Sequence, residues 1–430
     1  MSNKQRKLLA AAALIILCVL LVIIVVSRFG LRDTVPVFEP KETVTPTPTP
    51  MPTPAPTPAP KQYIFTFVGD NTITNSNLSA HFDSVVKGDM SYCYKNVRSF
   101  FADDDMTFGN LECIISDKPL YSSSMFHFKA PVASTQMLTK AGFEFMTCAN
   151  NHIRDYGSTG IEDTRAALTD AGINHGFDAE SVIYTTKSGV SVGVYCAFES
   201  YQLNSERAAA IVSNLRSRGA EIVIFALHWG NEGCYRPTAY QTQLAHSYID
   251  AGCDIVYGSH PHVLQPVEEY GGGLIMYSLG NFCFGGNSGA RDMDSAIVRV
   301  SFERDSAGKP VMKGYELIPC RFSSIASSND YCPTPYVKGS TEYDRVISKL
   351  DGSFTGPDII PDYSFMDKDK DKPDPSPTPE PSEEPSPTPE PSEEPSTKPS
   401  PEPEPSAEPE PEPEPEILPE DTEDDNAFSA

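Results

Sequence analysis

Two histidines flank a proline at the end of an apolar run, in the stretch YGSHPHVLQP at residues 257–266. Proline restricts the residue before it to extended backbone, so His260, Pro261 and His262 are expected to form a short strand-like segment. Side chains alternate along such a segment, which turns both imidazoles to the same side. Two imidazoles on one side can bind a metal ion, or they can be two polar loop residues.

Polar residues follow five apolar stretches of the sequence, at the points where strands are expected to end. Ligands of open α/β sheets bind just beyond the carboxyl ends of the strands, and parallel strands bring those ends to one rim. The clusters are Asp70 after FTFV, Asn110 and Glu112 in FGNLE, Asn151 and His152 after TCA, His228 after FAL, and the His260/His262 pair after IVYGS. We therefore expect the five clusters to converge.

Carboxylate, amide and imidazole groups suit divalent zinc, manganese or iron. A carboxylate such as Asp70 or Glu112 could bridge two ions, and two ions about 4 Å apart can activate a water for attack on a phosphoester. The pattern thus predicts one or two divalent ions and a hydrolytic site. Hydrogen bonds to the ligands are expected from Asn110, Asp155, Glu232 and Asn281.

Each cluster also has a purely structural explanation. Asp70 can cap a turn, Glu112 can be a solvated charge at a strand end, and Asn151 can belong to a turn. His228 precedes Trp229, the only tryptophan of the chain, so this pair can be a packing corner. The metal prediction fails only if all of these explanations hold together.

Apolar strands alternate with helical stretches through most of the chain, which is the pattern of an α/β sheet covered by helices. Strands are expected at 63–70, 106–112, 143–152, 190–198, 221–230 and 253–260. Helices are expected at 133–142, 159–171, 205–218 and 238–252. After residue 262, strands joined by glycine-rich turns predict a second, largely antiparallel sheet in the same domain.

Residues 8–27 form an uncharged apolar run that is long enough to cross a bilayer as one helix. Three basic residues within residues 1–7 favour a cytoplasmic N-terminus. A cleaved signal peptide is the alternative, but it would have a shorter apolar core followed by a small-x-small site. The sequence therefore predicts a single-pass membrane protein whose remaining residues lie outside the cytoplasm.

Proline-rich segments flank the region that is expected to fold. The linker at 28–61 contains TPTPTPMPTPAPTPAP, which favours an extended spacer. The segment 367–430 repeats PSPTPEPSEE and holds about 22 acidic and 4 basic residues, so it carries most of the net charge of −26. Such a composition predicts a disordered tail. The negative charge argues against a nucleic-acid partner.

The folded domain is expected at 62–335, with a C-terminal extension at 336–366. Nine of the ten cysteines lie outside the apolar run, and an odd number cannot all pair. Cys320 and Cys332 lie in a loop-rich stretch and are the expected disulfide.

Six motifs occur in a fixed order: GD (69–70), NLE (110–112), NNHIRDYG (150–157), HWGNE (228–232), AGCDIVYGSHPHVLQPVE (251–268) and YSLGNFCF (277–284). This order resembles the bacterial capsule synthesis protein CapA family, which is associated with poly-γ-glutamate. The likeness covers about residues 63–322. The family is in turn similar to calcineurin-like metallophosphoesterases, so the resemblance implies a helix-covered double β-sandwich with a two-metal site at strand ends.

The resemblance also implies roles for individual residues. The implied metal ligands are Asp70, Glu112, Asn151, His228, His260 and His262, with Glu112 in the bridging position. His152 resembles the acid histidine of the superfamily and is the expected catalytic residue. Phosphoesterases carry DxH at the first strand, whereas Asp70 is followed by Asn71 and Thr72. One imidazole is therefore missing, which leaves both a one-ion and a two-ion site open.

Three functions are compatible with the sequence. The resemblance implies an anchored extracytoplasmic protein that assists the synthesis, export or retention of an anionic polymer such as poly-γ-glutamate, together with other membrane polymer-synthesis subunits. The site residues favour a metal-dependent hydrolase acting on phosphoester substrates of the cell envelope. The third is a non-catalytic surface binding module.

Overall fold

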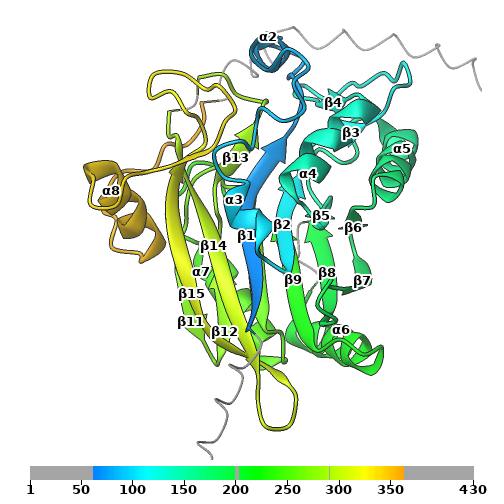
Figure 1. The fold of residues 1–430 in the computed structure, drawn as a ribbon, viewed down its shortest axis with the longest axis vertical. Coiled ribbons are helices and arrows are strands. Elements are labelled where there is room, and N and C mark those ends of the chain that lie inside the picture. Colours follow the sequence, from blue (N-terminus) through cyan, green and yellow to red (C-terminus); the bar gives the residue numbers. More distant parts are fainter. Residues whose placement is uncertain (1–61, 199–202, 290, 363–430) are drawn as a thin grey trace, which may run out of the picture. The chain divides into compact units, whose positions relative to one another are not determined.

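The structure, a computed structural model, describes residues 62–198, 203–289 and 291–362. Two β-sheets pack face to face, and helices cover their outer faces (Figure 1). This mixed α/β architecture agrees with the predicted helix-covered pair of sheets. The predicted anchor, linker and acidic tail lie outside the described residues. Within the described ranges, no helix has the length and hydropathy needed to span a membrane.

The larger sheet contains eight strands in the order β16-β15-β14-β1-β2-β5-β6, and β13 pairs with β1 beside this path. Its strands are β1 (Gln62–Thr72), β2 (Met106–Leu111), β5 (Phe145–Thr147), β6 (Asn174–Gly176), β13 (Asn281–Phe284), β14 (Asp294–Arg304), β15 (Pro310–Arg321) and β16 (Thr334–Pro335). β1 runs parallel to β2 and to β13 but antiparallel to β14. The carboxyl ends of β1 and β2 therefore lie together.

The smaller sheet contains six strands in the order β11-β12-β10-β9-β8-β7. Its strands are β7 (Glu180–Thr185), β8 (Ser191–Phe198), β9 (Ile222–His228), β10 (Ile255–Ser259), β11 (Val267–Tyr270) and β12 (Gly273–Met276). β9 is parallel to both β8 and β10. A short two-stranded sheet pairs β3 (Ile114–Ile115) with β4 (Lys129–Ala130).

Alternation along the strands builds the core between the two sheets. In β9, Ile222, Ile224 and Ala226 face the larger sheet, whereas Val223 and Phe225 pack against helices. Each of the larger side chains, such as Ile222, Ile224 and Phe225, stabilises the fold by roughly 1.5–3 kcal/mol relative to exposure. Burial on both faces explains why β9 is a continuous apolar run and not a polar and apolar alternation.

The helices belong to two groups, one on each outer face, and to a C-terminal addition. Their bounds are α2 (His81–Val86), α3 (Ser99–Ala102), α4 (Thr135–Ala141) with the preceding 3-10 turn η1 (Val132–Ser134), α5 (Gly157–Asp170), α6 (Ser205–Ser217), α7 (Ala239–Asp250) and α8 (Thr341–Leu350). α6 and α7 cover the smaller sheet. α8 packs against β14 and β15 (Figure 1). The compact unit that contains both sheets extends through Ile360.

The distribution of strands between the sheets differs from the expectation. The strands after residue 262 do not form a separate antiparallel sheet, because β11 and β12 join the smaller sheet and β13–β16 join the larger one. The strands that carry the polar clusters are likewise divided, with β1 and β2 in one sheet and β9 and β10 in the other. Strand pairing depends on long-range packing, which local periodicity does not encode.

The predicted disulfide between Cys320 and Cys332 is absent. All nine cysteines in the described part of the chain are free. The Cys320 thiol is buried within β15 and donates a hydrogen bond to the carbonyl oxygen of Ile318 at 3.3 Å. Cys332 is also buried, and both thiols therefore behave as small apolar core groups.

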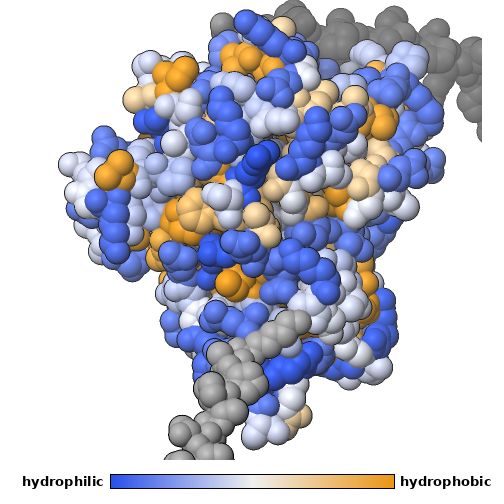
Figure 2. Space-filling model, viewed as in Figure 1, coloured by the Kyte–Doolittle hydropathy of each residue, from blue (hydrophilic) through white to orange (hydrophobic). Residues whose placement is uncertain are grey.

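The surface of the face in Figure 2 is largely hydrophilic, and its hydrophobic patches are small and separate. The most exposed large apolar side chains include Leu78, Tyr121 and Val337, which lie on different segments. Single exposed apolar residues are normal on soluble domains. This face therefore offers no extended apolar docking surface.

A buried carboxyl group far from the polar strand ends predicts a pH-dependent stability. Burial raises the pKa of Asp104 to about 6, although its Oδ2 accepts a hydrogen bond from the Thr107 hydroxyl at 2.6 Å. The unfolded chain releases this proton at a lower pH than the folded chain does. This group's contribution to stability should therefore fall as the pH rises from about 4 to about 6.

We expect the Asp104→Asn variant to lack this contribution, because the amide keeps the hydrogen bond from Thr107 but does not titrate. Relative to the variant, the wild type should lose up to about 3 kcal/mol of unfolding free energy across this window. Urea denaturation at pH 4 and pH 7 measures the difference. Equal changes in unfolding free energy between pH 4 and pH 7 in the wild type and in Asp104→Asn would contradict the prediction.

Candidate metal centre

The register of β1 brings three polar side chains together. Asp70 lies opposite Asn110 of β2 on one side and opposite Asn281 of β13 on the other. The Asn110 amide donates a hydrogen bond to Asp70 Oδ1 at 2.9 Å. A Cβ added to Gly69 would lie 2.0 Å from the carbonyl oxygen of Gly280, so only glycine permits β13 to approach β1 this closely. In the GD motif, Gly69 therefore permits the close contact with β13, and Asp70 supplies the buried carboxylate.

Glu112, just beyond β2, is fully buried and only partly hydrogen-bonded. Its Oε2 accepts a hydrogen bond from Asn110 at 3.4 Å, whereas Oε1 has no hydrogen-bond partner among the described residues. Three imidazole Nε2 atoms surround Oε1, at 4.0 Å in His152, 3.9 Å in His228 and 3.7 Å in His262. These distances are too long for hydrogen bonds. Burial raises the pKa of Glu112 well above its usual range.

His152 is the last residue of the NNH segment and is held by Asp155. Its Nδ1 lies 2.9 Å from Asp155 Oδ2, which directs Nε2 towards Glu112. The backbone N–H of His152 donates to Asn150 Oδ1 at 3.1 Å, and the Asn150 amide donates to Asn110 Oδ1 at 3.1 Å. Asn150 therefore joins the turn to β2, a role that we did not assign from the sequence.

His228 ends β9 and is almost completely buried. Its Nδ1 lies 2.9 Å from the hydroxyl of Ser259, and its Nε2 lies 2.9 Å from Asn151 Oδ1. Burial first, and then the neighbouring His260 and His262, lowers the pKa of His228 well below its usual range. The ring is therefore neutral, which is the form that binds a metal. Ser259 was missed in the sequence, although it directly precedes His260.

Trp229 does form the packing corner that was the alternative interpretation of the HWG motif. Its indole N–H donates to the carbonyl oxygen of Tyr277 at 3.1 Å, and its ring stacks on the Tyr277 ring at 6.3 Å. The backbone N–H of Trp229 donates to the carbonyl oxygen of Ser259 at 3.0 Å. The HWG motif therefore has two roles. Trp229 packs in the core, and His228 contacts the polar cluster.

The backbone at His260 and His262 is a bend and not the extended segment expected. The φ angles are +100° at His260 and +55° at His262, and both lie in the left-handed region. The local preference imposed by Pro261 is overridden by tertiary contacts, since the backbone N–H of Gly233 donates to the Pro261 carbonyl at 2.8 Å. Strained backbone of this kind persists only where the surrounding structure holds it.

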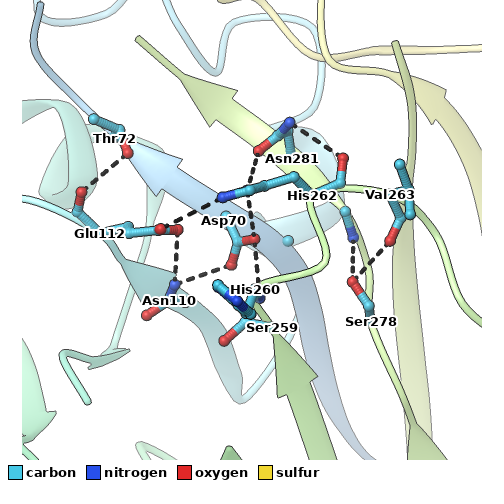
Figure 3. Close-up of polar contacts among 12 residues, drawn as sticks. Asp70, Thr72, Asn110, Glu112, Ser259, His260, His262, Val263, Ser278 and Asn281 are labelled. Carbon is cyan, nitrogen blue, oxygen red and sulfur yellow. Dashed lines mark hydrogen bonds and ion pairs between the residues drawn. The ribbon is translucent and has the colours of Figure 1, made fainter. Parts of the chain in front are cut away.

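Both imidazoles of the bend nevertheless reach the polar cluster (Figure 3). His262 Nδ1 lies 3.0 Å from Asn281 Oδ1 and 3.4 Å from Asp70 Oδ2. The Asn281 amide in turn donates to the His262 carbonyl at 3.3 Å. His260 Nδ1 is buried without a hydrogen-bond partner among the described residues. The two imidazole rings therefore lie on the same side, as expected, but a bend places them there and not a strand.

The two histidines of the bend differ in protonation. Burial, followed by the charge on His262, lowers the pKa of His260 to about 4. Burial acts in the same direction on His262, but the carboxylates of Glu112 and Asp70 outweigh it and raise its pKa to about 10. The Glu112 carboxyl group and the His262 imidazole therefore both hold protons more tightly than usual in the metal-free chain.

Two groups of ligand atoms satisfy the spacing of a metal site. Asp70, Glu112 and His262 form the first group, and Glu232, His260 and His262 form the second, with ligand atoms within 4.8 Å of one another in each. Glu232 lies in the loop after β9 and was expected only to support the ligands. Its place in the second group makes it a candidate ligand.

The donor set fits a divalent ion. Two ligand atoms bound to zinc at about 2.1 Å in a tetrahedral site lie about 3.4 Å apart, which is close to the 3.7 Å and 3.9 Å between Glu112 Oε1 and the Nε2 atoms of His262 and His228. A carboxylate oxygen without a hydrogen bond is costly when buried. Bound cations remove that cost, and imidazole with carboxylate suits zinc, manganese or iron.

All the residues singled out in the sequence lie in this one cluster. A continuous set of contacts links Asp70, Asn110, Glu112, Asn151, His152, Asp155, His228, Glu232, His260, His262 and Asn281. Their roles as ligands or catalytic groups remain predictions. At the junction of the two sheets, the cluster contains two groups of side chains that could hold a metal ion.

The chain belongs to the family described as bacterial capsule synthesis protein PGA_cap, whose model matches residues 64–286. It is 32% identical over 235 residues to the capsule biosynthesis protein CapA of Bacillus anthracis, which covers 48% of this chain and 57% of that protein. It is 28% identical over 280 residues to the PGA biosynthesis protein CapA of Bacillus subtilis strain 168, which covers 60% of this chain and 70% of that protein.

Solved structures resemble the chain only distantly. A hypothetical protein from Thermus thermophilus matches with a TM-score of 0.37 and 14% identity, covering 60% of this chain and 98% of that one. A putative 5′-nucleotidase from Staphylococcus aureus matches with a TM-score of 0.34 and 16% identity, covering 60% of this chain and 54% of that one. Likeness at this level supports no conclusion about chemistry.

Proposed function

We propose that this chain is a membrane-anchored, extracytoplasmic protein that assists the synthesis, export or retention of an anionic polymer such as poly-γ-glutamate. Membership of the capsule synthesis family supports a role in making a capsule polymer. The names of the two Bacillus relatives support poly-γ-glutamate as that polymer. The apolar run at 8–27 supports the anchor. The observation that carries a metal-dependent role is the buried, unpartnered Oε1 of Glu112 facing three imidazoles of the described residues.

The residues that would hold the metal come from both sheets. They are Asp70, Glu112, Asn151, His228, His260 and His262, with Glu232 as an added candidate from the structure. A bound divalent ion supplies positive charge that attracts carboxylate or phosphate oxygens. The Asp155 carboxylate orients His152 through Nδ1, so His152 Nε2 is placed to hold or move a proton at the rim.

Metal quantification on the purified full-length chain tests the site. We expect one or two manganese, zinc or iron ions per wild-type chain, and less than a tenth of that content in the His260→Ala/His262→Ala double variant. Deleting the gene should deplete surface polyanion, and only the wild-type gene should restore it. Unchanged surface polymer after deletion would contradict the proposed process. Restoration by the metal-free double variant would instead support a binding module.

A metal-dependent phosphoesterase is the second candidate, and the Asp155–His152 pair favours it. A histidine held by a carboxylate beside a metal centre is suited to general acid catalysis. Manganese-dependent cleavage of bis(p-nitrophenyl) phosphate should then be lost in His152→Ala while the metal content is unchanged. Absence of cleavage with each of the three metals would count against this activity.

A further inference from the structure

The residues after α8 form a strap across the loop that carries Glu232. We call residues 351–360 the C-terminal strap and residues 230–236 the ligand loop. Both the strap and α8 lie beyond residue 286, where the match to the family model ends. The strap is therefore a segment of this chain that lies outside the six family motifs.

The strap begins at a firmly anchored helix. The Lys349 amine, near the end of α8, lies 2.7 Å from both Asp292 Oδ2 and Asp294 Oδ2, and the Lys349 side chain is only 2% exposed. The Arg345 guanidinium forms two hydrogen bonds with the Asp294 carboxylate, at 2.6 and 2.7 Å. Buried and bidentate ion pairs of this kind restrict the position of both partners. The first residue of the strap therefore has a defined position beside β14.

Contacts along the strap hold the ligand loop. The Ile359 backbone N–H donates to the carbonyl oxygen of Gly233 at 2.9 Å. Asp358 Oδ1 accepts hydrogen bonds from the Tyr235 backbone N–H at 3.0 Å and from the Arg236 guanidinium at 2.8 Å. The ring of Phe354 packs edge-on against the ring of Tyr235, with centroids 4.9 Å apart.

The ligand loop holds the His260–Pro261–His262 bend in turn. The Gly233 N–H donates to the Pro261 carbonyl at 2.8 Å, so two successive backbone hydrogen bonds join Ile359 to Gly233 and Gly233 to Pro261. Glu232 directly precedes Gly233, and Pro261 lies between the two histidines. The strap therefore reaches the second ligand group, Glu232, His260 and His262, by a backbone path through Gly233.

The bend needs such support because its backbone is strained. Each non-glycine residue in the left-handed region costs on the order of 1–3 kcal/mol, and the bend contains two. By contrast, Asp70 belongs to β1 and Glu112 directly follows β2, where sheet hydrogen bonds position them. The second ligand group thus depends on loops, and the strap contacts one of those loops at Gly233, Tyr235 and Arg236.

We propose that the C-terminal strap is a positioning element of the metal centre, which holds Glu232 and the His260–Pro261–His262 bend in the arrangement that binds a cation. This inference rests on the proposed metal-dependent function. Gly233 is the residue at which the strap acts. A Cβ at Gly233 would lie 2.6 Å from the Ile359 carbonyl oxygen, and its φ is +73°.

Two pairs of variants separate this role from general destabilisation. Ending the chain after residue 350 removes the strap, and ending it after residue 362 leaves the strap in place and removes only residues 363–430, which include the acidic tail. Gly233→Ala disturbs the contact with Ile359. Gly189→Ala is its control, because Gly189 also has a positive φ, +86°, but no described atom within 4 Å of an added Cβ beyond its chain neighbours.

The first readout is Mn²⁺ binding by calorimetry on the full-length chain and the variants. We expect the chain ending at 350 and Gly233→Ala to bind Mn²⁺ at least tenfold more weakly than the wild type, and both controls to bind as the wild type does. If the truncated chain is unfolded, the comparison of Gly233→Ala with Gly189→Ala alone tests the inference. Equal affinities for Gly233→Ala and Gly189→Ala would overturn the inference.

The second readout is hydrogen–deuterium exchange without metal, which does not depend on the proposed function. We expect at least tenfold faster exchange at residues 231–236 and 260–263 in Gly233→Ala than in Gly189→Ala, with unchanged exchange in β1 and β2. If the wild type binds no metal, the proposed function fails, and this measurement alone decides about the strap. Equal exchange rates in the two variants would overturn the strap's role.

Discussion

A Glu112→Gln variant is expected to lose its metal and at the same time to become more stable in the metal-free form. Glu112 Oε1 faces three imidazole nitrogens and accepts no hydrogen bond from the described residues. Substituting residues that only support metal ligands typically weakens affinity 10- to 100-fold, so loss of a direct ligand should exceed about 100-fold. Calorimetric titration with Mn²⁺ measures this loss.

The gain in stability follows from the same oxygen atom. Because burial raises the pKa of Glu112, folding at neutral pH must either take up a proton or bury a charge, and the neutral amide of glutamine avoids both while keeping the shape. A buried polar oxygen without a hydrogen-bond partner costs on the order of 1–3 kcal/mol. Asp70 remains beside His262, at 3.4 Å, to balance its charge. The unfolding free energy of the metal-free variant should therefore rise by about this amount in urea denaturation.

Glu144→Gln is the matched control for metal binding. Glu144 precedes β5 in the same sheet, and its carboxylate accepts a hydrogen bond from the Thr107 backbone N–H at 2.7 Å instead of facing histidines. The same chemical change there should leave Mn²⁺ affinity as in the wild type. Retention of wild-type affinity by Glu112→Gln, or equal loss in both variants, would refute the assignment of Glu112 as a ligand.

A Lys349→Met variant is expected to be destabilised by about 3–5 kcal/mol, which is the usual cost of removing one partner from a buried ion pair. The Lys349 amine lies 2.7 Å from the carboxylates of both Asp292 and Asp294. Methionine fills a similar volume but leaves two carboxylates close together, and Arg345 can neutralise only Asp294. The loss is measured by urea denaturation of the wild type and the variant.

Lys338→Met provides the comparison on an exposed lysine. Lys338 lies in the turn before α8 and is exposed. Surface substitutions usually change stability by no more than about 0.5 kcal/mol. A similar loss in both variants, or a loss below about 1 kcal/mol at Lys349, would mean that the ion pairs with β14 do not anchor α8.

The elements of the fold were more predictable than their arrangement. The run YIFTFVGD and the run EIVIFALHWG correspond to β1 and β9, because continuous apolar residues mark strands buried on both faces. The division of the strands between two sheets was not predictable from their pattern. β10 and β13 are similar short apolar strands, yet β10 pairs with β9 and β13 pairs with β1.

The sequence largely predicted which residues lie together in the site, but it did not predict the geometry of their backbone. Polar residues at strand ends identified Asp70 and His228, since their residue types contrast with the apolar runs before them. Glu232 was predicted only to support the ligands, because nothing in its neighbours shows that a loop folds back onto the His-Pro-His bend. The preference of the residue before proline is a local effect, and it gave the wrong backbone for His260, where contacts from distant residues decide.

The packing of Trp229 gives the protein a built-in optical reporter. The indole is the only one in the chain, it is almost fully buried against Tyr277, and it is joined to His228 by one peptide bond. Changes at His228 therefore reach a single fluorophore with no background from other indoles. We therefore expect intrinsic fluorescence emission to report cation titrations of the candidate metal centre without any label.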